Sequence, residues 1–208
     1  MENLPDQLIS VELKKYRIVA TTEICSAIRT FIPLLLHWNS KISLTTVTDP
    51  LEIVRFHFGE SMFAASVLAN KNGRLADVGS GAGFPGIPLK LVIPTLDVVL
   101  IESNAKKAAF LAEAVRELAL AKVEVFHGRF DSFNAGALGL DFITARALGM
   151  HDRLVKLSRS AINPGGGLIL WLGEADAARV SMETSWQWRK PLAIPGTHSR
   201  FLLVGDEF

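Results

Sequence analysis

The chain has 208 residues, of which 49% are hydrophobic and 21% charged, and its formal net charge at pH 7 is +1. This length suits one sizeable core and is short for two full domains, and the near-neutral charge does not imply a large, uniformly basic nucleic-acid-binding face. The single cysteine, Cys25, excludes a disulfide framework and a cysteine-rich metal site, so we expect a cytoplasmic protein without a metal. No apolar run reaches membrane-spanning length, and the first ten residues do not form a signal peptide pattern.

The N-terminal segment is predicted to be helical. Residues 5–16 fit a short first helix, and a longer helix begins at Thr21 or Thr22. An apolar stripe follows along the longer helix at steps of three and four residues: Ile24, Ala27, Ile28, Phe31, Leu34, Leu35 and Trp38. Cys25 lies near the start of this stripe, and we expect it to be a small buried hydrophobe.

A third helix is predicted after a loop at residues 38–45. Residues 49–52, Asp-Pro-Leu-Glu, supply a helix cap, a first-turn proline and the acid of a capping box. His57, Glu60 and Ser61 then follow at spacings of three and four, so the three side chains can share one face. Such a trio is typical of a helix-surface network. A hydrolase is a poor interpretation because no third triad partner is within reach in the sequence.

The stretch from Leu75 to Glu102 predicts a nucleotide-binding βαβ unit. A short apolar strand at 75–78 leads directly into three glycines, and a helical pattern begins at Phe84. Glycine permits a positive φ and lets a ligand approach the backbone closely. A second strand, residues 97–101, ends at Glu102, whose carboxylate is placed to accept hydrogen bonds from ribose hydroxyls.

An acid before the glycines indicates which nucleotide is bound. The string Asp77-x-Gly79-x-Gly81-x-Gly83 resembles motif I of the class I S-adenosylmethionine (SAM) methyltransferases. Gly81-x-Gly83-x-x-Gly86 also fits the dinucleotide fingerprint, but an acid near the loop would repel a pyrophosphate, whereas it can help to hold the cationic end of SAM. A nicotinamide dehydrogenase is therefore the weaker interpretation. A glycine-rich turn that binds nothing is the remaining alternative, and the flanking strands and terminal acid argue against it.

The second half of the chain is predicted to complete a mostly parallel α/β sheet with an antiparallel C-terminal hairpin. The expected helices are one capped by Asn104 and two at residues 150–161 and 174–184. The expected strands are residues 123–126, 141–144, 168–172, 187–194 and 200–204, with turns at 163–167 and at Pro195-Gly196. Ligands in such sheets bind at the carboxyl edge of the strands.

A local basic cluster lies in the second half of the chain. Arg146, Arg153, Lys156 and Arg159 stand against one acid, Asp152. A solvated helix face is the favoured interpretation on charge alone, and a patch that contacts nucleic acid is the alternative.

Four segments resemble the RsmG (GidB) family of methyltransferases. They are W-N-S-K-I-S-L-T at 38–45, D-P-L-E-I-V-R-F-H-F-G-E-S at 49–61, D-V-G-S-G-A-G-F-P-G-I-P at 77–88 and T-A-R-A at 144–147. The resemblance runs from about Phe31 to Gly173, and the F-P-G-I-P extension is its most specific part. The chain departs from the family pattern at Glu60, where aspartate is usual, at Ala145, where serine is usual, and at the end of the fifth strand, where a lysine is common.

The resemblance implies a class I SAM-methyltransferase fold in a single domain, with an N-terminal helical extension at 1–66 and a SAM-binding α/β core at 67–208. It implies methyl transfer from SAM to N7 of a guanosine in the 530 loop of bacterial 16S ribosomal RNA, with that RNA or the small ribosomal subunit as partner. Guanine N7 has a free lone pair, so no general base is required. The alternatives are a SAM-dependent methyltransferase of another RNA or a small substrate, and a non-catalytic RNA-binding module on the same fold.

The cofactor-binding residues follow from analogy with that fold. The amino-acid end of SAM is flanked by Gly79, Ser80, Gly81 and Gly83, and Phe84 follows them. Asp77 shapes the loop, and Glu102 takes the ribose. Arg129, Phe130 and Asp131 surround the adenine, with Asp131 or a backbone carbonyl open to its exocyclic amine, although an ordinary helix start is the alternative for these three residues.

Two further residues are implied at the catalytic position. Arg146 ends the fourth strand, so we expect it to face the methyl group and to orient the RNA. The alternative for Arg146 is a structural ion pair, for instance to Asp141 or Glu60. His57 is expected to form part of the RNA-facing wall with the 38–45 loop, and a structural histidine is its alternative.

Overall fold

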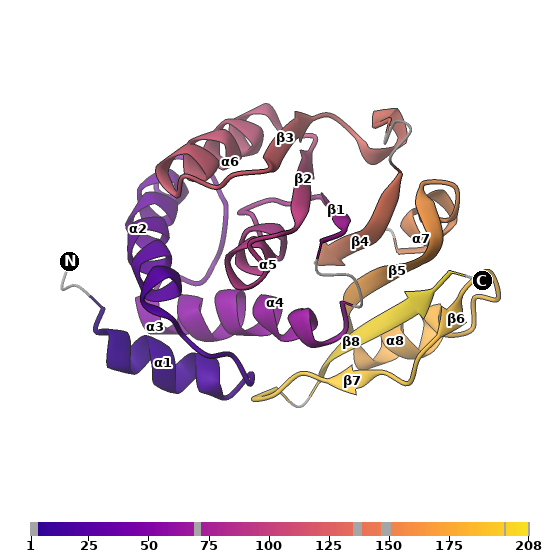
Figure 1. Ribbon diagram of the computed structural model, residues 1–208, viewed down its shortest axis with the longest axis horizontal. Helices are drawn as coiled ribbons and strands as arrows, with labels where there is room; N and C mark the ends of the chain where they lie inside the picture. Colours follow the sequence, from indigo (N-terminus) through magenta and orange to yellow (C-terminus); the bar gives the residue numbers. More distant parts are fainter. Residues whose placement is uncertain (1–3, 69–71, 135–138, 147–150, 198, 208) are drawn as a thin grey trace.

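The computed structural model describes residues 4–68, 72–134, 139–146, 151–197 and 199–207 (Figure 1). Within these residues the sheet has eight strands, in the order β3-β2-β1-β4-β5-β8-β6, and β7 also pairs with β8. The first five strands in this order, β3, β2, β1, β4 and β5, run parallel to one another. Strand β8 is antiparallel to β5, β6 and β7, which confirms the predicted sheet and its C-terminal hairpin. The strands are β1 (Arg74–Val78), β2 (Asp97–Glu102), β3 (Val123–His127), β4 (Leu140–Arg146), β5 (Ile162–Gly173), β6 (Gln187–Trp188), β7 (Leu192–Ala193) and β8 (Arg200–Asp206).

Three of the described helices begin where the sequence places capping residues. Thr21 accepts a hydrogen bond from the backbone N–H of Ile24, Asp49 from that of Glu52, and Asn104 from those of Lys106 and Lys107. The helical elements are α1 (Asp6–Lys14), α2 (Thr22–Asn39), α3 (Pro50–Glu52), the π-helix η1 (Ile53–Gly59), α4 (Glu60–Met62), the 3₁₀ helix η2 (Phe63–Ser66), α5 (Gly86–Val92), α6 (Ala105–Glu117), the 3₁₀ helix η3 (Phe130–Ser132), α7 (His151–Arg159) and α8 (Glu174–Val180). None of these helices is both long and apolar enough to cross a membrane. The predicted start of α7 at Met150, and Ala147 of the T-A-R-A segment, lie outside the described residues.

One predicted turn is wrong. Residues 163–167 are part of β5, which starts at Ile162 rather than at Leu168. Its pairing with β4 passes from Leu140–Ile162 directly to Phe142–Gly167, so residues 163–166 bulge out of the register without ending the strand. A Cβ on Gly166 would lie 2.7 Å from the carbonyl oxygen of Asp141, so this glycine lets the bulge pack against β4. Glycines indicated a turn because turns and bulges require the same backbone freedom.

Helices cover both faces of the sheet (Figure 1). On one face, α1, α2, the helical segment 50–66, α5 and α6 share a single apolar cluster with inward-facing sheet residues such as Leu75 and Leu100. On the other face, α7 and α8 pack on a second cluster that contains Val78 and Ile143. Alternate residues of β1 thus enter opposite cores, as expected for a strand covered on both sides. The carboxyl ends of β1, β2 and β4 remain at the edge between these layers.

Candidate active site

The glycine loop between β1 and α5 has the backbone conformation that its sequence predicts. Gly79, Gly81 and Gly83 all have positive φ, at 71°, 56° and 84°. A Cβ on Gly83 would lie 2.5 Å from Cδ1 of Ile87, so a side chain there would push the loop away from α5. The N–H groups of Gly79 and Ser80 donate to the carbonyl of Ile101, which fixes the loop at the end of β2. The loop therefore presents bare backbone at the carboxyl edge of the sheet.

Asp77 holds this loop from below. Its side chain is completely buried, and its carboxylate accepts hydrogen bonds from the Gly86 N–H at 3.0 Å and the Thr144 hydroxyl at 3.1 Å. Burial raises the pKa of Asp77 to about 6, while these donors act against the rise. Of the two roles predicted for Asp77, shaping the loop agrees with this geometry. Direct contact with the cationic end of a ligand does not, because the carboxylate faces the protein interior.

Glu102 ties the loop to the end of β2. One carboxylate oxygen accepts from the Gly81 N–H at 2.9 Å and the other from the Asn104 N–H at 2.8 Å. The residue is only 7% exposed, although it ends the strand where the predicted ribose position lies. Each carboxylate oxygen has two lone pairs, so these two hydrogen bonds leave acceptor capacity for hydroxyl groups.

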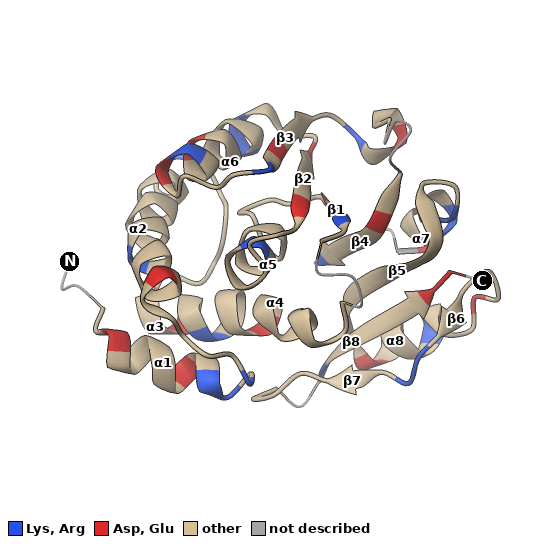
Figure 2. Ribbon diagram, in the orientation of Figure 1, with Lys and Arg blue, Asp and Glu red and all other residues tan. Residues whose placement is uncertain are grey.

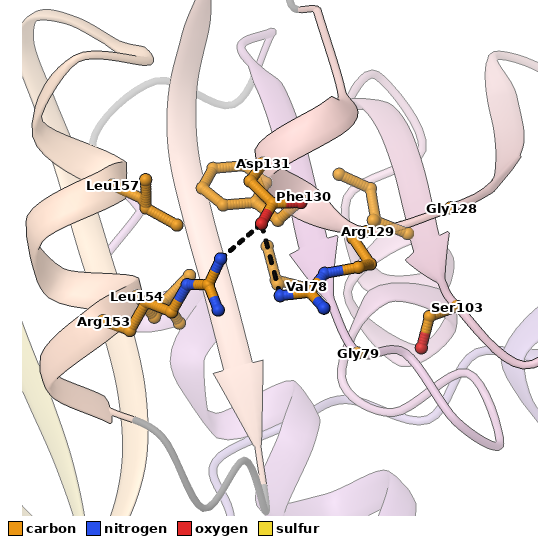
Figure 3. Close-up of a pocket in the computed structure, with 11 residues that line it drawn as sticks. Val78, Gly79, Ser103, Gly128, Arg129, Phe130, Asp131, Arg153, Leu154 and Leu157 are labelled. Atoms are coloured by element: carbon orange, nitrogen blue, oxygen red, sulfur yellow. Dashed lines mark hydrogen bonds and ion pairs between the residues drawn. The ribbon is translucent and has the colours of Figure 1, made fainter.

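A cavity of about 270 Å³ opens beside the loop (Figure 3). It brings together four of the residues predicted to bind the cofactor, Gly79, Arg129, Phe130 and Asp131. The remaining lining comes from the ends of β1 and β2, from the segment after β3 and from α7, namely Val78, Ile101, Ser103, Gly128, Arg153, Leu154 and Leu157. A mostly apolar cavity with a few polar groups at a sheet's carboxyl edge is the usual form of a nucleoside site.

Asp131 joins two elements across this cavity. Its carboxylate pairs with Arg129 at 3.3 Å and with Arg153 of α7 at 2.5 Å (Figure 3). The sequence placed Arg153 in a basic cluster and gave no role to it at the cavity. The signal that could have found it is the position of α7, which follows β4 and therefore starts at the carboxyl edge.

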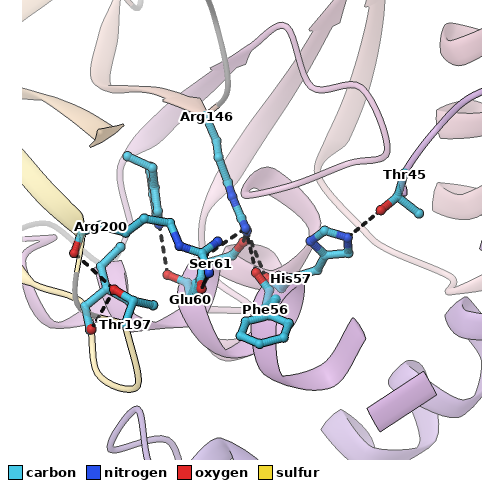
Figure 4. Close-up of polar contacts among 10 residues, drawn as sticks. Thr45, Phe56, His57, Glu60, Ser61, Arg146, Thr197 and Arg200 are labelled. Carbon is cyan, nitrogen blue, oxygen red and sulfur yellow. Dashed lines mark hydrogen bonds and ion pairs between the residues drawn. The ribbon is translucent and has the colours of Figure 1, made fainter. Parts of the chain in front are cut away.

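Arg146 is held by the helical segment that contains η1 and α4 (Figure 4). Its guanidinium donates to the carbonyls of Phe56 at 2.5 Å and His57 at 3.3 Å, to the Ser61 hydroxyl at 3.1 Å, and to Glu60 at 3.0 Å. Only 13% of the side chain is exposed. The ion pair with Glu60, which was the alternative for Arg146, is thus present, and the guanidinium is directed at the η1–α4 segment.

Glu60 is fully buried and has two cationic partners. Arg200 of β8 forks onto the same carboxylate, with nitrogen–oxygen distances of 3.0 and 2.9 Å. The Trp171 indole N–H donates to the backbone carbonyl of Glu60 at 2.9 Å. Burial raises the pKa of Glu60, and the two guanidinium groups oppose that rise. Arg200 was missed in the sequence because it lies 140 positions from Glu60.

His57 lies between the 38–45 loop and the glycine loop. Its Nε2 is 2.7 Å from the Thr45 hydroxyl, and its ring stacks on Phe84 with centroids 4.7 Å apart. Burial and, to a lesser degree, the charge of Arg146 lower the pKa of His57 to about 4. At neutral pH the imidazole is therefore uncharged.

The predicted cofactor residues do not all reach the cavity. Ser80 is 2% exposed, and its hydroxyl donates to the backbone carbonyl of Asp77. Phe84 is 8% exposed and packs against Phe31, Phe58 and His57. These two residues support the loop from its buried side. Among the residues that the structure describes, no cluster of three or more His, Cys, Asp or Glu side chains could hold a metal ion.

The basic cluster of the second half is not a single solvated face. Arg146 pairs with Glu60, Arg153 with Asp131, and Arg159 with Glu207 at 2.6 Å. Asp152, the one acid within the cluster, pairs with Arg179 of α8. The three arginines therefore serve three separate contacts.

Comparison with solved structures places this fold among methyltransferases. A SAM-dependent methyltransferase from Aquifex aeolicus superposes with a TM-score of 0.62 at 17% identity, over 77% of this chain and 94% of that one. M. jannaschii TYW2 in complex with AdoMet superposes with a TM-score of 0.55 at 15% identity, over 71% and 73% of the two chains. At these identities the likeness shows the class I methyltransferase fold.

Sequence relatives are closer. Ribosomal RNA small subunit methyltransferase G of Stenotrophomonas maltophilia (strain K279a) is 37% identical over 169 residues, which is 80% of this chain and 78% of the relative. The protein of the same name from Xanthomonas campestris pv. campestris (strain B100) is 36% identical over 177 residues, 84% and 82% of the two chains. The family model for GidB, rRNA small subunit methyltransferase G, matches residues 24–198. With its loop, cavity and fold in agreement, the chain belongs to the GidB family of small-subunit rRNA methyltransferases.

Proposed function

We propose that this protein transfers the methyl group of SAM to N7 of a guanosine in the 530 loop of 16S ribosomal RNA in the cytoplasm. The observation that carries the proposal is the family match across residues 24–198, joined to a cavity that opens beside the glycine loop.

The residues present fit SAM as the donor. The positive-φ glycines leave the backbone at Gly79 and Gly81 open to the amino-acid end of a ligand, and Glu102 retains acceptor capacity for ribose hydroxyls. The cavity between Gly79 and Asp131 has the apolar walls that an adenine ring needs. When bound, SAM supplies an electrophilic methyl group on a sulfonium.

The chain's own residues position the reactants and need not move a proton. Guanine N7 attacks with a free lone pair, so a general base is unnecessary, and the neutral, buried His57 is consistent with a wall residue. Arg146 holds the η1–α4 segment through two backbone carbonyls and Glu60, so it acts on the acceptor site through that segment. Positioning matters because a displacement of about 1 Å can reduce the rate on the order of 100-fold.

The test is methylation of small-subunit RNA that lacks the modification. Purified protein is incubated with labelled SAM and either unmodified 16S rRNA or small subunits, and the labelled nucleotide is mapped. We expect one labelled guanosine in the 530 loop. The matched control carries 7-deazaguanosine at that position, which replaces N7 by a carbon and should abolish transfer. Labelling of another RNA, or SAM binding without transfer to any RNA, would contradict the proposal.

A further inference from the structure

Two buried carboxylates on the same side of the molecule each hold two cations. Glu12 of α1 accepts from Lys15 at 2.8 Å and from Arg55 of η1 at 2.9 Å. Glu60 of α4 is shared by Arg146 at 3.0 Å and Arg200 at 2.9 Å. One carboxylate neutralises one cation, so each cluster retains one positive charge.

The surplus charge faces solvent. The side chains of Glu12 and Glu60 are 7% and 0% exposed, whereas those of Arg55 and Arg200 are 34% and 42% exposed. Hydrogen bonds from Arg55 hold the pKa of Glu12 at about 2, despite its burial, so this acid is ionised at neutral pH. The acids thus lie beneath each cluster, and Arg55 and Arg200 form its exposed part.

One aromatic ring joins the two clusters. The guanidinium carbon of Arg55 lies 5.6 Å from the centroid of the Phe56 ring, and that of Arg200 lies 5.5 Å from the same centroid. These are cation–π distances, so the ring holds both guanidinium groups near each other despite their like charge. Lys15, Arg55, Arg200 and Arg146 therefore form a continuous cationic row.

The cationic row ends at the active site. Arg146 is the last residue of β4, and Arg200 pairs in register with Gly173, the last residue of β5. Both lie at the carboxyl edge of the sheet, where the glycine loop and the cavity also lie. From there the row crosses η1 to the C-terminal end of α1, where Arg55 pairs with Glu12. In Figure 2, α1 runs beside the helical segment labelled α3 and α4, of which η1 is the middle part.

We propose that the cationic row binds the sugar–phosphate backbone of the RNA next to the methylated nucleotide, with Arg55 and Arg200 as its phosphate contacts. This inference rests on the proposed function, since it assumes that RNA is the substrate. Arginine suits the task because it remains charged and has five N–H donors, more than its carboxylate partner uses here. Such contacts fix the register of the RNA and carry no sequence information. A net charge of +1 for the chain is compatible with this surface because the row is local.

The test is the salt dependence of RNA binding by the full chain with Arg55→Gln and Arg200→Gln combined. Both buried carboxylates keep a cation in this variant, Lys15 on Glu12 and Arg146 on Glu60. Each lost phosphate contact should flatten the plot of log affinity against log salt by about 0.7 for single-stranded RNA, so the double variant should lose about 1.4. Each single variant should lose half of that, which keeps the test open if the double variant does not fold. Melting temperature and SAM affinity report on folding.

A matched control removes two arginines at the opposite edge of the sheet. Arg189 forks onto Asp206 at 2.6 and 2.7 Å, and Arg116 pairs with Glu117. Arg116→Gln with Arg189→Gln changes the net charge equally and should leave the slope unchanged. Arg55→Lys with Arg200→Lys should restore the wild-type slope, because the number of charges is restored.

The outcomes separate the two proposals. An unchanged slope in the Gln variants, an equal loss in the control, or no restoration by lysine would overturn the cationic row. The probe is unmodified 16S rRNA. The Gln substitutions should weaken binding to a scrambled RNA of equal length by the same factor, because contacts to phosphates do not depend on the base sequence. If the wild type binds RNA with a clear salt slope yet transfers no methyl group, the proposed function fails while the row is still tested. If it binds no RNA, both fail.

Discussion

The imidazole of His57 lies against the ring of Phe84, with the two planes inclined by 30°. One of these residues belongs to the helical segment that carries the cationic row, and the other to the glycine loop. The contact therefore connects the surface proposed for RNA with the loop proposed for SAM. It also covers part of the His57 ring, and burial is the main reason why the pKa of His57 falls to about 4.

Replacing His57 should change how stability depends on pH. The folded-state pKa of about 4 lies below the ordinary histidine pKa of 6.5, so the unfolded chain binds the proton first as the pH falls. His57 then contributes stability that is fully present above pH 6.5 and is lost as the pH falls toward 4, by up to roughly 3 kcal/mol. In urea titrations at pH 7 and pH 4.5, His57→Gln should show a smaller loss between the two values than the wild type. Equal losses would mean that His57 does not carry this linkage.

Asp77 variants should separate the hydrogen bond from the charge. Asp77→Ala leaves the buried Gly86 N–H without its acceptor, which should lower the free energy of unfolding by about 1–3 kcal/mol and weaken SAM binding. Asp77→Asn keeps an acceptor and removes a buried carboxyl group, the pKa of which is raised to about 6. The wild type loses stability as the pH rises toward 6, because the buried carboxyl group must then ionise. The free energy of unfolding of Asp77→Asn relative to that of the wild type should therefore be highest above pH 6. Calorimetry and urea unfolding at pH 7.5 check both variants, and an Ala variant that binds SAM normally would refute the supporting role.

Glu102 should matter for SAM more than for folding. Glu102→Ala removes the acceptor for the Gly81 N–H and the predicted acceptor for ribose, so affinity should fall by about 1.5–3 kcal/mol, or roughly ten- to a hundredfold. Glu102→Gln keeps one acceptor oxygen, so its affinity for SAM should lie between those of the Ala variant and the wild type. Isothermal titration with SAM measures all three, and unchanged affinity in a folded Ala variant would end the ribose assignment.

Arg146 and Glu60 should show strong energetic coupling. Removing Arg146 takes one donor away from the carbonyls of Phe56 and His57, and removing Glu60 leaves two arginines without their acid. Arg146→Gln and Glu60→Gln are therefore each expected to destabilise the fold, and the double variant by less than their sum, with a coupling of about 0.5–3 kcal/mol. A double-mutant cycle by chemical unfolding gives this value. Additive losses would indicate that the pair acts independently.

Much of the fold could be predicted because its signals are local. The caps at Thr21, Asp49 and Asn104 lie within three residues of the groups that they satisfy, and the parallel strands follow from short apolar runs. The βαβ unit was recognisable because its glycines and its terminal acid stand at fixed places around the strands.

The site was predicted less completely because its key contacts are long-range. Arg146 reaches Phe56 and Glu60 across about ninety positions, and neither spacing nor charge pattern shows where a guanidinium will point. Asp77 stands where a ligand-binding acid would, yet the partner that turns it inward, Thr144, comes from a strand 67 positions away. Arg153 was assigned to a surface cluster because its partner, Asp131, belongs to a different loop.

The ring of Phe31 touches three other aromatic rings edge-on: Phe58 at 5.4 Å, Phe84 at 5.6 Å and Phe110 at 5.9 Å between centroids. These rings come from α2, η1, the glycine loop and α6, so one side chain is buried jointly by the N-terminal helices and the nucleotide-binding unit. If the N-terminal helices were moved onto another methyltransferase, Phe31 and Phe58 would lose the rings of Phe84 and Phe110. The N-terminal helices are thus not an independent module: exchanging them would require redesigning the packing beneath the glycine loop in the same step.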